Sequence, residues 1–276
     1  MWRSAQRRWR GLPIWGWVLG CVVVTAGIAL GALWVTGNLG AKVESPHNEL
    51  TETARRQIEE GDLVGAIADL ETVVAENPQD SEAHFLLGQA YNQSGDLLKA
   101  ADEFRTVLEL DPGNAAAHHN LGVTYFQLQD PNTAISEFEA ALEIDPDDAD
   151  TRYQLGATYL VTALSSPTGA DVDLMEAAVA EFEAALRLRE NMPEALIGMS
   201  HVKMQEGDYG AAIEMLRNAL TQLPSSPEAH FALAEAFARS GDAAQSCDAY
   251  QAFIELSPPE DWLTQAREEM RIIGCP

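Results

Sequence analysis

Proline recurs along this chain at a fixed interval, and the interval restricts the folds that the chain can adopt. Pro78, Pro112 and Pro146 lie 34 residues apart, as do Pro224 and Pro258. The gap between Pro146 and Pro224 equals two of these intervals with ten residues added. A period of this length is typical of stacked helix–turn–helix units, which bury their apolar faces against their neighbours. The sequence therefore predicts an all-α solenoid.

Six repeats fit this period when the first begins at His47. Their residues are 47–80, 81–114, 115–148, 149–192, 193–226 and 227–260. The eighth position of each repeat is small: Ala54, Gly88, Gly122, Gly156, Ser200 and Ala234. The twentieth position is small as well: Ala66, Ala100, Ala134, Ala178, Ala212 and Ser246. These residues predict two antiparallel helices in close contact, because a larger side chain at either position would overpack the helix pair.

Bulky residues, turns and helix ends complete the pattern. The twenty-fourth position is large and is expected to fill the space between one unit and the next: Leu70, Phe104, Phe138, Phe182, Leu216 and Tyr250. Gly-Asp pairs at residues 61–62, 95–96, 207–208 and 241–242 predict the turn inside a unit, because Gly ends a helix readily and Asp caps the next one. The recurring proline stops the second helix, since it cannot continue the hydrogen-bond ladder.

Together these positions closely resemble the tetratricopeptide repeat family over residues 47–260. The Trp that the family usually carries at position four is absent, and His84, His118 and His230 stand there instead. The resemblance implies a right-handed solenoid of six repeats, followed by a capping helix and tail over residues 261–276. The predicted helix at residues 260–272, together with the residue that follows it, places five side chains on one face: Trp262, Leu263, Ala266, Met270 and Ile273.

The fourth repeat contains the ten extra residues, around residues 165–173. They fit either a longer turn or two helices that each extend by about a turn. A loop insertion costs little stability, so it can be functionally neutral. A contact loop for a partner is the alternative.

The first 36 residues predict a membrane anchor. An uncharged run from Leu12 to Val35 would be about 36 Å long as a helix, which exceeds a hydrocarbon core of about 30 Å. We therefore predict a transmembrane helix at 12–36 and a linker at 37–46. Residues 1–11 carry four arginines, which predicts a cytoplasmic N-terminus. The repeat domain would then lie outside the cytoplasm, in a bacterial cell envelope. A cleaved signal peptide and a lipoprotein site at Cys21 are alternatives that fit this run less well.

The net charge limits the class of partner, and the cysteines suggest a disulfide. The chain has 17 basic and 43 acidic residues, which makes nucleic acid a poor partner and favours a basic protein, or simply a well-solvated surface. Outside the predicted membrane helix the cysteines are Cys247 and Cys275. Their elements should pack together, so a disulfide is expected in an oxidising compartment, with two free thiols as the alternative.

The sequence offers little for catalysis. The sequence contains no glycine-rich phosphate-binding loop that ends in Lys-Ser or Lys-Thr, no Gly-x-Ser-x-Gly, no His-Glu-x-x-His and no Cys-x-x-Cys. We therefore expect no enzyme activity, no cofactor and no metal site. The acidic segment at residues 145–150 lacks the glycine and glutamate of a calcium loop. Helix capping explains these carboxylates, and packing explains the position-four histidines.

In the family that this chain resembles, the first helices of the repeats line a groove that binds peptides. Carried over by position, the resemblance implies a groove lined by Phe85, Gln89, Asn92, His119, Val123, Phe126, Gln127, Tyr153, Leu160, Ile197, His201, Met204 and Phe231. Phe126 and Tyr153 are the expected apolar anchors. Packing between neighbouring first helices is the alternative role for some of these residues.

The resulting hypothesis is a membrane-anchored scaffold that binds a peptide segment. The alternative is an accessory subunit of a cell-envelope enzyme or secretion complex, which contacts its partners through the insertion or the membrane helix. The sequence leaves the oligomeric state open.

Overall fold

The structure is a computed structural model that describes residues 46–165 and 171–275. The predicted N-terminus at 1–11, membrane helix at 12–36 and nearly all of the linker lie outside these residues. Within the described part, no helix is both long enough and apolar enough to span a membrane. Nearly all of the repeat region lies in one compact unit, Leu50–Pro276.

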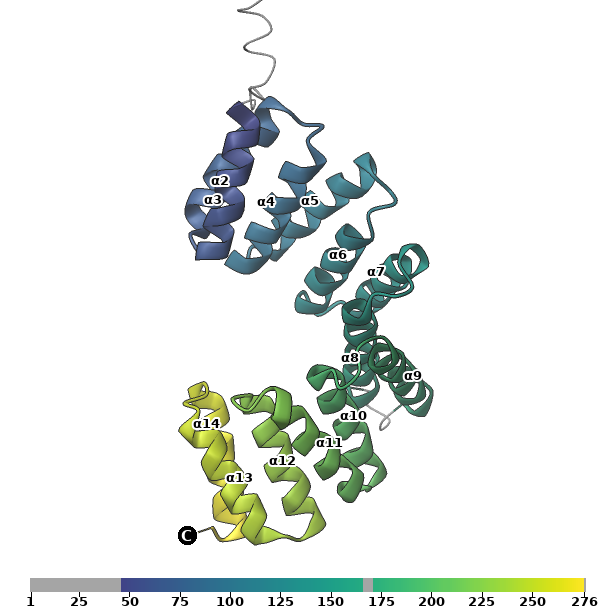
Figure 1. Cartoon of the computed structure of the whole chain (residues 1–276), viewed down its shortest axis with the longest axis vertical. Helices are drawn as coiled ribbons and strands as arrows, with labels where there is room; N and C mark the ends of the chain where they lie inside the picture. Colours follow the sequence, from purple (N-terminus) through teal and green to yellow (C-terminus); the bar gives the residue numbers. More distant parts are fainter. Residues whose placement is uncertain (1–45, 166–170, 276) are drawn as a thin grey trace, which may run out of the picture. The chain divides into compact units, whose positions relative to one another are not determined.

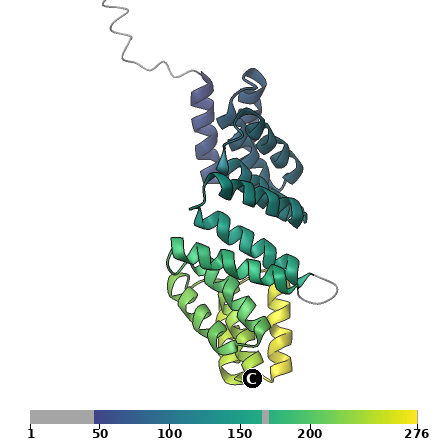
Figure 2. The same ribbon diagram turned by 90° about the vertical axis from the view of Figure 1, so that its right-hand side faces the viewer.

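Every regular element in the described residues is an α-helix (Figure 1). The bounds are α2 Pro46–Glu60, α3 Leu63–Glu76, α4 Ser81–Ser94, α5 Leu97–Leu110, α6 Ala115–Gln127, α7 Pro131–Ile144, α8 Ala149–Leu164, α9 Val172–Leu188, α10 Pro193–Glu206, α11 Tyr209–Gln222, α12 Pro227–Ser240, α13 Ala243–Glu255 and α14 Glu260–Ile273. From α4 to α13, each helix packs against the next along the chain (Figures 1 and 2). The predicted all-α solenoid of helix pairs is therefore confirmed.

The turns inside the repeats follow the predicted chemistry. Gly95 ends α4 with φ +88°, a left-handed conformation that glycine adopts without steric cost. Asp62 and Asp208 each accept a hydrogen bond from a backbone N–H in the first turn of the helix that follows. In the third repeat, which lacks the glycine, Gln129 takes φ +62° instead. The turn geometry is thus kept even where the residue type is unfavourable.

The small and bulky positions meet inside each repeat. A methyl group added to Gly88 would lie 2.8 Å from the Phe104 ring, and one added to Gly122 would lie 2.7 Å from the Phe138 ring. The bulky residue was expected to fill the space between units, and it also packs on the eighth position of its own repeat. That position must therefore be small.

The ten extra residues of the fourth repeat lengthen both of its helices. Helix α8 has 16 residues and α9 has 17, whereas α10 and α11 each have 14. The structure combines the two predicted alternatives, because both helices are longer and the connection between them, residues 165–171, has more residues than the connection at 207–208 in the next repeat. Residues 166–170 of that connection are outside the described part.

Helix α14 closes the C-terminal end of the array. Ala266 is fully buried, and Leu263, Met270 and Ile273 pack against the core formed by α10–α13. The Trp262 ring lies 5.9 Å from Phe231 and 6.2 Å from Phe253, centroid to centroid. The structure also joins Cys247 of α13 to Cys275 just beyond α14, with an S–S distance of 1.99 Å and a Cα–Cα distance of 5.6 Å. The capping helix is therefore held by apolar contacts and by a covalent link.

Candidate functional site

A row of rings occupies the fifth position of the repeats, on the first helices. Phe85, His119, Tyr153 and Phe231 form this row, which we call the ring ladder. Each packs on the bulky ring at position twenty-four of its own repeat. The centroid distances are 5.7 Å for Phe85–Phe104, 5.8 Å for His119–Phe138, 6.2 Å for Tyr153–Phe182 and 5.6 Å for Phe231–Tyr250. The core rings therefore fix the orientation of the ladder.

The ladder is half-buried and runs along one face. All four of its side chains are partly accessible, whereas the rings beneath them at position twenty-four are fully or almost fully buried. The first helices of successive repeats contact one another, α4 with α6, α6 with α8, α8 with α10 and α10 with α12. They therefore form a continuous surface, which we call the first-helix face. It presents partly exposed rings that are already ordered.

The polar groups predicted on this face connect neighbouring repeats. The Asn92 side-chain amide donates to Thr124 Oγ1 at 2.9 Å and to Gln127 Oε1 at 3.2 Å. His119 Nδ1 lies 2.6 Å from Thr151 Oγ1. Asn92, Gln127 and His119 therefore hold α4, α6 and α8 together, and any ligand would have to compete with these bonds or extend them.

Three predicted groove residues are in the core. Leu160 is 6% exposed, Ile197 is 4% exposed and Met204 is 3% exposed. They pack into the core clusters of the fourth to sixth repeats, so the expectation that they line an open groove is corrected for these three. The cause is the close contact between neighbouring first helices. The other predicted residues are at least partly accessible: Phe85, Gln89, Asn92, His119, Val123, Phe126, Gln127, Tyr153, His201 and Phe231.

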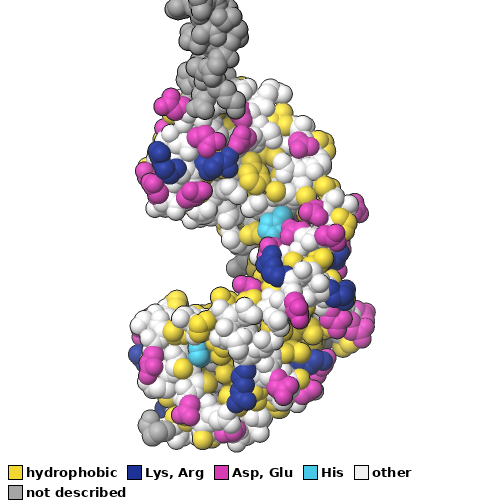
Figure 3. Space-filling view, viewed as in Figure 1, with side chains coloured by type: hydrophobic (Ala, Val, Ile, Leu, Met, Phe, Trp, Pro, Cys, Tyr) yellow, Lys and Arg dark blue, Asp and Glu magenta, His cyan; other side chains and the backbone are white. Residues whose placement is uncertain are grey.

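The first-helix face is acidic in its C-terminal half. Burial raises the pKa of Tyr153 to about 12, and the nearby carboxylates of Glu228 and Glu194 add to this shift. These two acids belong to α12 and α10, so both helices direct negative charge toward the α8 tyrosine. Acidic side chains are also spread over the surface seen in Figure 3. A basic segment would be attracted to this face.

Sequence reasoning missed an ion pair beside the ladder. The Arg189 guanidinium donates to the two carboxylate oxygens of Asp150 at 2.9 and 2.7 Å. These hydrogen bonds hold the pKa of Asp150 below its usual value. Asp150 is the second residue of α8, but Arg189 follows α9 and is 39 residues away. No local pattern could have paired them.

Two of the three position-four histidines have carboxylate partners, whereas His230 Nε2 lies 3.0 Å from the Pro224 carbonyl oxygen. His84 Nδ1 lies 2.6 Å from Glu103, and His118 Nδ1 lies 2.7 Å from Glu137. Both pairs join the first and second helices of one repeat, in the place where the family usually has Trp. Among the described residues, no three His, Cys, Asp or Glu side chains are grouped so that they could hold a metal ion.

The imidazole of His201 predicts a loss of stability in acid. Burial lowers its pKa below the usual value, and the carboxylates of Glu228 and Glu235 oppose this shift only in part, while Arg239 adds to it. The unfolded chain recovers a pKa of about 6.5 and so binds the proton more readily. Stability from this group is therefore complete above that pH and is lost as the pH falls through 6.5 toward the folded pKa.

We expect the urea midpoint to fall between pH 7 and pH 5, and the fall to be smaller in a His201→Gln variant. The variant removes only part of the slope, because burial also lowers the pKa of His119. Urea titrations at several pH values, followed by circular dichroism, measure the effect. Equal slopes in the two proteins, or a His201 imidazole that titrates above 6.5 by NMR, would contradict the prediction.

Comparisons with known proteins place this geometry in a family. Two family models, both described as tetratricopeptide repeat, match the chain, one over residues 51–115 and 197–261 and the other over residues 92–154. No curated protein matches it.

Several solved structures share the fold. PilW, a type IV pilus biogenesis factor, has a TM-score of 0.66 at 19% identity, over 84% of this chain and 99% of PilW. PilF of Pseudomonas aeruginosa has a TM-score of 0.64 at 16% identity, over 79% of this chain and 97% of PilF. YrrB, described as having an unusual peptide-binding site, has a TM-score of 0.50 at 21% identity, over 72% of this chain and 97% of YrrB. The family models together cover more than half of the chain, and its repeats carry the small, bulky and proline positions described above. The chain therefore belongs to the tetratricopeptide repeat family.

Proposed function

We propose that this protein is an interaction scaffold without enzymatic activity, and that it binds a peptide segment of another protein on its first-helix face. The ring ladder carries this proposal. Its rings are held by the core and need no further ordering when a ligand binds, which lowers the entropic cost of association. Partly exposed rings in a row suit the apolar side chains of an extended peptide or an amphipathic helix.

The acidic surroundings of the ladder specify the partner further. Arg189 and Arg239 are each paired with a carboxylate of the same region, Asp150 and Glu235. Neither is therefore available as a free cation for an acidic ligand. We infer a segment with apolar side chains and flanking Lys or Arg, whose approach is accelerated by charge.

We further propose that residues 12–36 anchor the protein in a membrane and that the repeats lie outside the cytoplasm of a bacterial cell. The support is the uncharged run and the arginines before it. The fold similarity to PilW, described as a type IV pilus biogenesis factor, is compatible with an envelope assembly factor. The alternative, an accessory subunit of an envelope complex, is favoured by one feature, the lengthened fourth repeat.

Crosslinking in cells tests the proposal. A photoreactive residue in place of Gln89, which is half-buried on α4, should capture one dominant protein, whereas the same residue in place of the exposed Glu109 on α5 should capture none. In a Phe126→Ala, Tyr153→Ala double variant, we expect the yield from position 89 to drop about tenfold, because these rings would be the anchors of binding.

Two results would count against this function. Equal capture from positions 89 and 109 would show that the contact is not specific to the first-helix face. An unchanged yield in the double variant, with its helix content verified by circular dichroism, would show that Phe126 and Tyr153 do not anchor the bound segment. A Tyr153→Phe variant keeps the ring and is the matched control.

A further inference from the structure

The lengthened fourth repeat carries exposed apolar side chains at one edge. The Asp171 backbone N–H donates to the Ala163 carbonyl at 3.1 Å, so the end of α8 and the start of α9 lie together. Leu164, next to this bond on α8, is 42% exposed, and Val172, next to it on α9, is 64% exposed. Neither side chain is needed to fill the core of the repeat.

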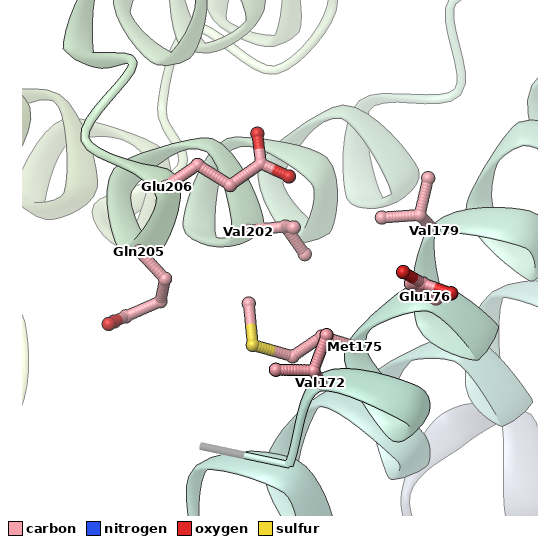
Figure 4. Close-up of a pocket in the computed structure, with 7 residues that line it drawn as sticks. All are labelled: Val172, Met175, Glu176, Val179, Val202, Gln205 and Glu206. Atoms are coloured by element: carbon pink, nitrogen blue, oxygen red, sulfur yellow. The ribbon is translucent and has the colours of Figure 1, made fainter. Parts of the chain in front are cut away.

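A cleft begins at this edge and runs between α9 and α10 (Figure 4). Its volume is about 480 Å³, a size typical of sites that bind a small ligand or a few side chains. Val172, Met175 and Val179 line it from α9, and Val202 lines it from α10. Figure 4 shows Met175 and Val202 pointing toward one another across the space. The inside of the cleft is therefore apolar.

The rim of the cleft is acidic. The carboxylates of Glu176 and Glu206 border it from opposite helices. The Lys203 ammonium lies 2.7 Å from Glu206, and this carboxylate, together with Asp208 and Glu183, raises the pKa of Lys203. Three acids thus act on this one cation, and Glu176 is a further carboxylate that lines the cleft. The local field attracts positive charge.

We propose that this cleft is a second docking site, which takes a bulky apolar side chain from a partner segment that has Lys or Arg beside it. The apolar interior accounts for the first requirement and the acidic rim for the second. The site contains no member of the ring ladder and goes beyond the function proposed above. Helix α9 has 17 residues and α11 has 14, and Val172 lies at the N-terminal end of α9, in the part that has no counterpart in the neighbouring repeat.

Selection from a random 12-residue peptide library displayed on phage, against the full chain in detergent micelles, tests the cleft. The test variant is Val172→Asp, and the matched control is Val64→Asp. Val64 is 83% exposed and also lies in the first turn of a second helix, so an aspartate has similar consequences for the fold at both places. We expect a class of peptides that the wild type and the control retain, and that Val172→Asp loses about tenfold, as for removal of an anchor contact.

The retained peptides should contain Leu, Ile, Met, Phe or Trp beside Lys or Arg. Glu176→Lys should also weaken the binding of these peptides, whereas the Phe126→Ala, Tyr153→Ala variant should bind them as the wild type does. The proposal is overturned if no peptide distinguishes Val172→Asp from Val64→Asp, if the peptides that do are acidic or purely polar, or if Glu176→Lys has no effect. Loss of the same peptides in the Phe126→Ala, Tyr153→Ala variant would also overturn it, because the cleft would then not be a separate site.

Discussion

Replacing Phe182 with Ala is expected to lower the free energy of unfolding by about 3–5 kcal/mol, the range for a large side chain removed from a core. Phe182 is fully buried and packs on two repeats at once. A methyl group on Gly156 of its own repeat would come within 2.9 Å of the ring, and one on Gly198 of the next repeat within 2.5 Å. Its removal leaves a cavity that neither helix pair can close alone. Urea denaturation followed by circular dichroism measures the loss.

Leu98→Ala is the control for this substitution. Leu98 is 71% exposed on α5, so its truncation should change the free energy of unfolding by less than about 0.5 kcal/mol. Because neighbouring repeats stabilise one another, the Phe182→Ala variant should also show a broader transition. A midpoint equal to that of Leu98→Ala would contradict the assignment of Phe182 as a shared core residue.

Breaking the Cys247–Cys275 bond is expected to have the second largest effect. The two residues are 28 apart in sequence, and a disulfide that closes a loop of this size contributes about 3 kcal/mol, chiefly by restricting the unfolded chain. The loss should be concentrated at the C-terminal end, because each repeat depends on its immediate neighbours. Hydrogen exchange of the α14 amides should accelerate on reduction, while that of α4 and α5 should not change.

A Cys247→Ser, Cys275→Ser double variant is the control. It should match the reduced wild type, and reductant should not affect it further. If reductant leaves the exchange of α14 unchanged in the wild type, the apolar contacts of Leu263, Ala266 and Trp262 are sufficient to hold the cap, and the disulfide adds nothing there.

The repeat architecture could be predicted because its determinants are local. A proline ends a helix, a Gly-Asp pair turns the chain, and small residues at positions eight and twenty recur with the period, so each mark has its effect within a few residues of itself. Ser246 illustrates this, since its hydroxyl donates at 2.9 Å to the carbonyl of Ala234, which joins the two small positions of one repeat. The amphipathic pattern of α14 likewise identified the residues that pack beneath it.

The functional face could be predicted only in part. Position in the repeat indicates which side of a helix a residue occupies, and this placed Phe85, His119, Tyr153 and Phe231 on the first-helix face. It does not give the distance to the next first helix, and that distance decides whether the residue is open or buried. Ile197 and Met204 share repeat positions with accessible residues, yet they lie in the core because α10 packs more closely on α8 and α12 than α6 packs on α4 and α8.

By itself, the sequence determined the helix pairs, their turns and the capping helix, because short-range sterics and hydrogen bonding set these features. The tertiary structure alone decided which predicted groove residues are buried, the pairing of Arg189 with Asp150, and the cleft between α9 and α10. Each of these features depends on contacts between side chains of different helices. How neighbouring helices pack determines such contacts, and the repeat pattern of the sequence does not encode them.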